Sequence, residues 1–94
     1  MEIETIIHEL KEIGTSINNK SNTLNCYLFG SVLTSNYPND IDVLVLYSNL
    51  KQLDGFKEKI KSLKKEFPLH LNYFTFSEEE ELKFVKNQNA EQIF

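Results

Sequence analysis

Arginine is absent from this 94-residue chain, so all ten of its basic side chains are lysines. Without guanidinium groups the protein has no bidentate clamp for phosphate or carboxylate. An anion therefore has to be held by lysine, by backbone N–H groups or by a metal ion. The formal net charge of −4 argues against a surface that wraps nucleic acid by neutralising its phosphates, and direct nucleic-acid binding is not expected.

Other absences limit the class of protein and its location. The single cysteine, Cys26, excludes an internal disulfide and fits a reducing compartment, and its apolar neighbours predict a packed core thiol. No apolar stretch approaches the ~18 residues of a membrane span. Glutamates at positions 2, 4 and 9 interrupt any signal-peptide core. We therefore expect one small cytoplasmic domain over residues 1–94, without a membrane partner.

The spacing of apolar residues predicts the order helix, strand, strand, helix, strand, helix, which is typical of a small α/β or α+β unit. Helices are expected where apolar residues recur every three or four positions, over residues 3–17 and 50–67. Strands are expected over residues 24–29, 40–47 and 69–76, the second of them buried on both faces. A Ser/Asn-rich loop over Thr15–Asn25, a helical turn over Ser31–Ser35 and a loop with Asn36, Pro38 and Asn39 connect them.

The C-terminal part of the chain is less regular. A capping-box pattern at Ser77–Glu80 predicts that a third helix starts there and runs to about Asn87. Beyond it, Ile93 and Phe94 could dock on the core of this domain or on another chain.

Two of the chain's three aspartates, Asp40 and Asp42, stand at the mouth of its most hydrophobic segment. On a strand, residues two apart point to the same face, so these carboxylates would lie side by side while Ile41 enters the core. At ~5 Å and an effective dielectric of ~20, the two charges repel by roughly 3 kcal/mol. A cation between them, or a proton on one of them, relieves this repulsion. Magnesium fits, because it binds to one or two carboxylates together with substrate phosphates.

Gly30 and Ser31 close the preceding apolar run. A glycine lets a phosphate approach the backbone, and the serine hydroxyl and the first N–H groups of a helical turn can hydrogen-bond it. Alone, either motif is weak evidence, because Gly-Ser pairs occur in many turns and aspartates often cap turns before strands. Their combination is more specific. The acids precede the apolar run, which argues against haloacid-dehalogenase-type phosphatases and many glycosyltransferases.

The stretch Leu28-Phe-Gly-Ser31, followed after eight residues by Asp40-Ile-Asp-Val-Leu-Val45, resembles the signature of the DNA polymerase beta-like nucleotidyltransferase superfamily. The resemblance is to its minimal, MNT-type members, and it implies a small mixed β-sheet flanked by helices. It also implies that Asp40 and Asp42 hold Mg²⁺ (or Mn²⁺) and that Gly30 and Ser31 contact the phosphates of a nucleoside triphosphate. An acceptor hydroxyl would then attack the α-phosphate and release pyrophosphate, as in a two-metal clamp.

Members of this superfamily usually carry a third carboxylate on the next strand, where it binds the catalytic metal. The corresponding strand, residues 69–76, has no acidic residue, and His70 stands where the aspartate is expected. Histidine is a poor magnesium ligand but suits softer divalent ions, and as a general base it could accept the acceptor's proton. His70 is therefore a catalytic base or ligand in an altered site, a remnant in an inactive copy, or an ordinary strand histidine. Alternation would place it on one face with Asn72, Phe74 and Phe76. Asp54, in the second helix, is a poor candidate for the missing acid.

Two functions from different classes follow from the resemblance. The first is a metal-dependent nucleotidyltransferase that moves a nucleoside monophosphate from a nucleoside triphosphate to an acceptor hydroxyl. The chain has no extra helical domain to grip the acceptor, so a helical HEPN-type partner of a toxin–antitoxin pair, or a homodimer, would supply that part. The second is a catalytically degenerate domain that acts as a binding or antitoxin-type partner. A third possibility is that the aspartates only cap a loop.

Overall fold

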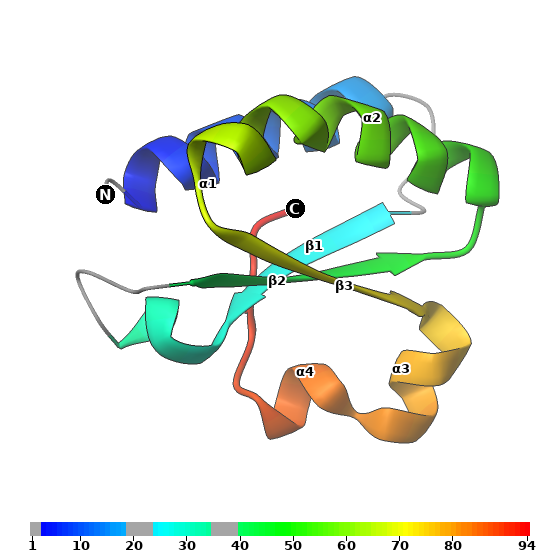
Figure 1. Ribbon diagram of the computed structural model, residues 1–94. Coiled ribbons are helices and arrows are strands. Elements are labelled where there is room, and N and C mark those ends of the chain that lie inside the picture. Colours follow the sequence, from blue (N-terminus) through cyan, green and yellow to red (C-terminus); the bar gives the residue numbers. More distant parts are fainter. Residues whose placement is uncertain (1–2, 19–23, 35–39) are drawn as a thin grey trace.

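The computed structural model describes residues 3–18, 24–34 and 40–94 of the chain (Figure 1). The elements are α1 (Ile3–Ile17), β1 (Leu24–Phe29), the 3-10 turn η1 (Gly30–Leu33), β2 (Ile41–Tyr47), α2 (Leu50–Glu66), β3 (Leu69–Thr75), α3 (Phe76–Leu82), α4 (Phe84–Asn87) and β4 (Glu91–Gln92). The predicted order of helices and strands is confirmed, and α4 and β4 add to it. The loop predicted over Thr15–Asn25 is shorter than expected, because residues 15–17 belong to α1 and residues 24–25 to β1. Residues 19–23, and residues 35–39 with Asn36, Pro38 and Asn39, lie outside the described residues.

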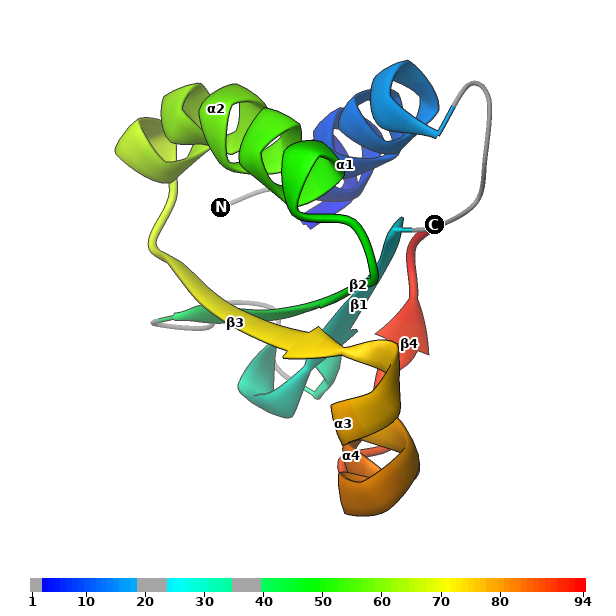
Figure 2. The ribbon, with the colours of Figure 1, turned by 90° about the vertical axis from the view of Figure 1, so that its right-hand side faces the viewer.

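The strands form one four-stranded mixed sheet in the order β3-β2-β1-β4. β1 is antiparallel to β2 and to β4, whereas β2 and β3 are parallel. Helices α1 and α2 cover one face of the sheet, and α3 and α4 lie on its other side (Figures 1 and 2). Because β2 lies between two strands and two helical layers, its residues Val43–Leu46 are all buried, which confirms the prediction of a strand buried on both faces.

The main core lies between the sheet and the layer formed by α1 and α2. Helix α2 contributes residues spaced three and four apart, which form one apolar face, namely Leu53, Phe56, Ile60 and Leu63. The strands contribute alternate residues, among them Cys26, which is fully buried. Burial raises the pKa of the Cys26 thiol to about 12, so the thiol stays protonated at neutral pH. The prediction of a packed core thiol is confirmed.

The C-terminal residues dock on this core rather than standing free of it. The N–H group of Cys26 donates to the carbonyl oxygen of Phe94 (2.9 Å), and the N–H group of Ile93 donates to the carbonyl oxygen of Cys26 (2.7 Å). The Phe94 ring packs over Gly14 of α1, where a Cβ atom would lie 2.5 to 2.7 Å from three atoms of the ring. Gly14 therefore gives this ring its place between α1 and the sheet.

The third helix differs from its predicted form at both ends. It begins at Phe76, because the capping box is formed by Thr75 and Glu78 rather than by residues 77–80. The Thr75 hydroxyl accepts the Glu78 N–H group (3.1 Å), and the Glu78 carboxylate accepts the Thr75 N–H group (2.9 Å). The helix also stops at Lys83, which has a left-handed backbone (φ 51°). The prediction of one continuous helix to Asn87 is therefore wrong, since the backbone turns at Lys83 and starts α4.

Candidate functional site

The sheet register brings the ends of three strands together at one edge. Antiparallel pairing sets Phe29, the last residue of β1, opposite Asp42, and parallel pairing sets Asp42 beside His70 of β3. The N–H group of Ile41 donates to the carbonyl oxygen of Pro68 (2.9 Å), which ties the start of β2 to the start of β3. Gly30, Asp42 and His70 therefore converge, although they come from three separate segments.

Asp42 and His70 are direct neighbours on the face of the sheet opposite α1 and α2. The Asp42 side chain points to this face because Ile41 and Val43, on either side of it, are buried in the main core. Its Oδ1 atom lies 3.5 Å from Nδ1 of His70, with the carboxylate 26% and the imidazole 76% exposed. This placement favours the interpretations in which His70 belongs to the site over that of an unrelated strand histidine.

Gly30 occupies a position that only glycine fills easily. Its φ of +80° is one that L-residues rarely adopt, and a Cβ atom there would lie 2.5 Å from Oδ2 of Asp42. The second carboxylate oxygen of Asp42 therefore occupies the space that a side chain at position 30 would need.

Replacing Gly30 with alanine is expected to lower the free energy of unfolding by about 2 kcal/mol, from backbone strain and from the collision with Asp42. Urea denaturation measures the change. Ser31→Ala is the matched control, because it removes an exposed hydroxyl from the adjacent residue and should change stability by less than about 0.5 kcal/mol. A Gly30→Ala protein as stable as the Ser31→Ala protein would contradict this packing.

The other two predicted site residues flank this convergence. Ser31 is exposed in η1, where its carbonyl oxygen accepts the Thr34 N–H group (3.1 Å) and closes the turn. Asp40 is exposed in the bend one residue before β2, because the strand begins at Ile41 rather than at Asp40. Chain connectivity keeps Ser31 beside Gly30. Asp40 lies two residues before Asp42 but outside the strand whose alternation was expected to set the two carboxylates side by side.

The donor set suits a cation that takes part of its coordination from water or substrate. Within residues 3–18, 24–34 and 40–94, no three His, Cys, Asp or Glu side chains are grouped as a metal site. Asp42 and His70 form a pair, and Asp54 is exposed on α2 in the opposite layer. One carboxylate and one imidazole suit a divalent ion that completes its shell with substrate phosphates and waters.

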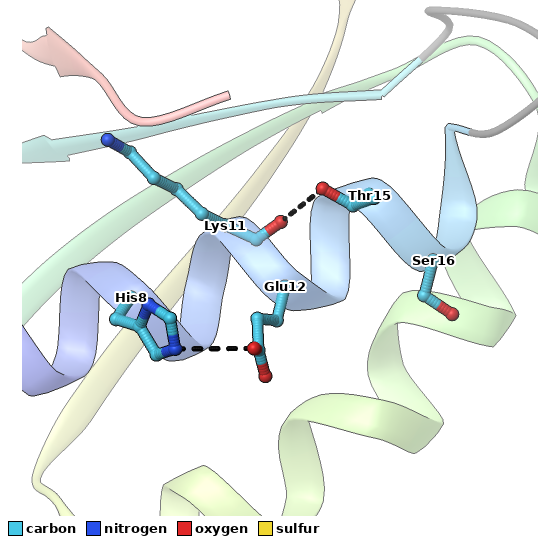
Figure 3. A pocket seen from close by; sticks show the side chains of 5 residues that line it. All are labelled: His8, Lys11, Glu12, Thr15 and Ser16. Atoms are coloured by element: carbon cyan, nitrogen blue, oxygen red, sulfur yellow. Dashed lines mark hydrogen bonds and ion pairs between the residues drawn. The ribbon is translucent and has the colours of Figure 1, made fainter.

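A shallow hollow runs along α1, away from this edge of the sheet (Figure 3). It is lined by His8, Lys11, Glu12, Thr15 and Ser16. Polar groups in the hollow contact other groups of the same helix. His8 Nε2 lies 3.2 Å from a Glu12 carboxylate oxygen, and the Thr15 hydroxyl donates to the Lys11 carbonyl oxygen (3.0 Å). We assign no function to this hollow.

The comparison with known protein families covers almost the whole chain. The sequence profile described as "Nucleotidyltransferase domain" matches residues 4–93. The chain belongs to this family. Among curated proteins, none matches the chain. In this nucleotidyltransferase domain the match extends from α1 to β4 and includes every candidate site residue.

Two further observations complete the description of the nucleotidyltransferase domain. Of the helices within the described ranges, none has the length and apolar character needed to cross a membrane.

The sequence did not indicate Phe84 of α4, whose ring packs edge-on against Phe29 (4.9 Å between centroids) and Phe74 (5.4 Å). Phe84 thereby places α4 on the sheet face that carries Asp42. Phe76, expected on that face of the strand, instead begins α3.

Proposed function

We propose that this nucleotidyltransferase domain transfers a nucleoside monophosphate from a nucleoside triphosphate to an acceptor hydroxyl, with Mg²⁺ or Mn²⁺. The convergence of Gly30, Asp42 and His70 at one sheet edge is the observation that supports it. Carboxylate, open backbone and imidazole are the groups needed for a phosphate-bound cation and a proton transfer.

Each site residue has a definite role in this proposal. Asp40 and Asp42 would hold the divalent cation, which when bound offsets the charge of the triphosphate and of the transition state. Gly30 lets the phosphates approach the chain, and the Ser31 hydroxyl and the N–H groups of η1 donate hydrogen bonds to them. With no arginine in the chain, these neutral donors take a larger share of phosphate binding.

The chemical step is a substitution at phosphorus. The acceptor oxygen forms a bond to the α-phosphorus while the bond from that phosphorus to the bridging oxygen of the β-phosphate breaks, and pyrophosphate leaves with the electron pair. The proton of the acceptor hydroxyl passes to solvent water or to a neutral imidazole of His70. A positioned base of this kind accelerates such a step by ~10²–10⁴-fold.

A second protein would complete the acceptor site. The family resemblance suggests a helical HEPN-type partner or a second copy of this chain. The open edge at Asp42 and His70 leaves the acceptor side of the site for such a molecule, since His70 is 76% exposed.

One observation favours a second function. His70 replaces the usual third carboxylate, which is also what a degenerate domain that binds nucleotide or a partner protein without catalysis would show. Such a domain would keep Asp40 and Asp42 and act as an antitoxin-type subunit.

Incubation with α-³²P-labelled nucleoside triphosphates, divalent cation and candidate acceptors separates these functions. The enzyme transfers label covalently to an acceptor and releases pyrophosphate. Nucleotide binding in calorimetry without label transfer to any acceptor supports the second function instead. Absence of both contradicts transfer and nucleotide binding, and leaves partner binding as the role of a degenerate domain.

A further inference from the structure

We infer that His70 is a direct ligand of the cation held by Asp42, and that it shifts the preference of this site from Mg²⁺ towards Mn²⁺, Co²⁺ and Zn²⁺. The inference rests on the proposed function only in taking Asp42 as a cation ligand. It decides between the two roles, base and ligand, that the sequence leaves open for His70.

The distance between the two donor atoms carries this assignment. Oδ1 of Asp42 and Nδ1 of His70 are 3.5 Å apart. Two ligand atoms that each lie ~2.1 Å from one metal ion, at a tetrahedral angle, are separated by ~3.4 Å. The pair therefore has the spacing of two ligands of one ion without moving the backbone.

The surroundings leave the imidazole available for this role. His70 is 76% exposed, and the parallel register fixes its Cα opposite that of Asp42. Asn72, the next side chain on the same face of β3, is held by a hydrogen bond from its Nδ2 to the carbonyl oxygen of Val43 (3.4 Å). Among the described residues, the β3 side of the site thus offers the ion a nitrogen at His70 and no carboxylate.

The change of donor atom alters which ion binds best. Mg²⁺ prefers an all-oxygen coordination shell, and negatively charged ligands increase its affinity most. Imidazole nitrogen instead suits the divalent transition-metal ions and Zn²⁺. Exchanging a third carboxylate for neutral imidazole removes one negative charge and one oxygen from the site. Both changes weaken the binding of Mg²⁺ more than the binding of Mn²⁺, Co²⁺ and Zn²⁺.

Proton NMR tests the ligand role on the whole chain, because the chain contains two histidines, His8 and His70. On addition of Zn²⁺ near neutral pH, the imidazole signals of His70 should shift, and this shift should depend on Asp42, whereas any shift of His8, which lies beside Glu12 on α1, should not. Asp42→Asn should abolish the His70 response, and Asp54→Asn, a matched change on α2, should leave it intact. An unmoved His70 signal, or a shift confined to His8, overturns the inference.

Calorimetry with metal alone tests the preference. His70→Asp should raise the affinity for Mg²⁺ relative to Mn²⁺ by about ten-fold, with circular dichroism confirming that the variant is folded. A ratio that changes by less than about two-fold overturns the inference. Zn²⁺ binding at His70 without label transfer removes the proposed activity and keeps this inference. Label transfer with an unmoved His70 signal keeps the proposed activity and overturns this inference.

Discussion

Replacing Asp42 with asparagine is expected to reduce nucleotidyl transfer by about a thousand-fold. The change keeps the shape of the side chain but removes the charge that binds the cation in the proposed function. A loss of several kcal/mol in transition-state stabilisation corresponds to about this factor. Initial rates of label transfer at fixed nucleotide and cation concentration measure it.

Asp54→Asn is the control for this variant, because it removes the same charge from an exposed position on α2 and should leave the rate unchanged. Thermal unfolding should show that Asp42→Asn is as stable as the parent, or slightly more stable, since repulsion from Asp40 is relieved. An Asp42→Asn protein with undiminished transfer would mean that the aspartates only cap the loop before β2.

A change from glycine to alanine at position 14 should lower the free energy of unfolding by about 2 kcal/mol, although alanine favours helix by about 1 kcal/mol. The reason is the Phe94 ring, three atoms of which lie 2.5 to 2.7 Å from where the new methyl group would be. The ring is held between α1 and Phe56 (6.5 Å between centroids), so it has to move to make room. Chemical denaturation measures the loss.

A double-mutant cycle identifies the cause. Phe94→Ala alone should cost about 3 kcal/mol, and in that background Gly14→Ala should become stabilising by about 1 kcal/mol. Gly55→Ala in α2 is the matched control: nothing lies within 4 Å of its Cβ position, so it should stabilise the protein by about 1 kcal/mol in either background. If Gly14→Ala behaves like Gly55→Ala in the parent protein, the ring does not pack over α1 as described.

The sequence predicted those parts of the fold that local patterns determine. The apolar spacing of α2 and the continuous apolar run of β2 indicated both elements, since each buries its own regular face. The C-terminal region was harder. Two overlapping capping patterns compete there, and the packing of Phe84 on Phe29 and Phe74, which no local pattern encodes, accompanies the break at Lys83.

The sequence indicated which residues belong to the candidate site, but it did not indicate how they are arranged in space. The signature around Gly30, Asp40 and Asp42 pointed to the site, and family resemblance pointed to His70. Local sequence does not encode strand register, so the parallel pairing that sets His70 beside Asp42 became visible only in the assembled sheet. The left-handed backbone of Gly30 and its approach to the Asp42 carboxylate likewise depend on two strands meeting.

The seat of the Phe94 ring on Gly14 also has a consequence for biosynthesis. The two residues are separated by 94 − 14 = 80 positions in the sequence. During synthesis, the side of α1 that carries Gly14 therefore stays uncovered by the Phe94 ring until the chain has been made as far as that residue. Such a late, long-range closure slows folding, and we expect chains arrested before Phe94 to be the form that chaperones and proteases encounter.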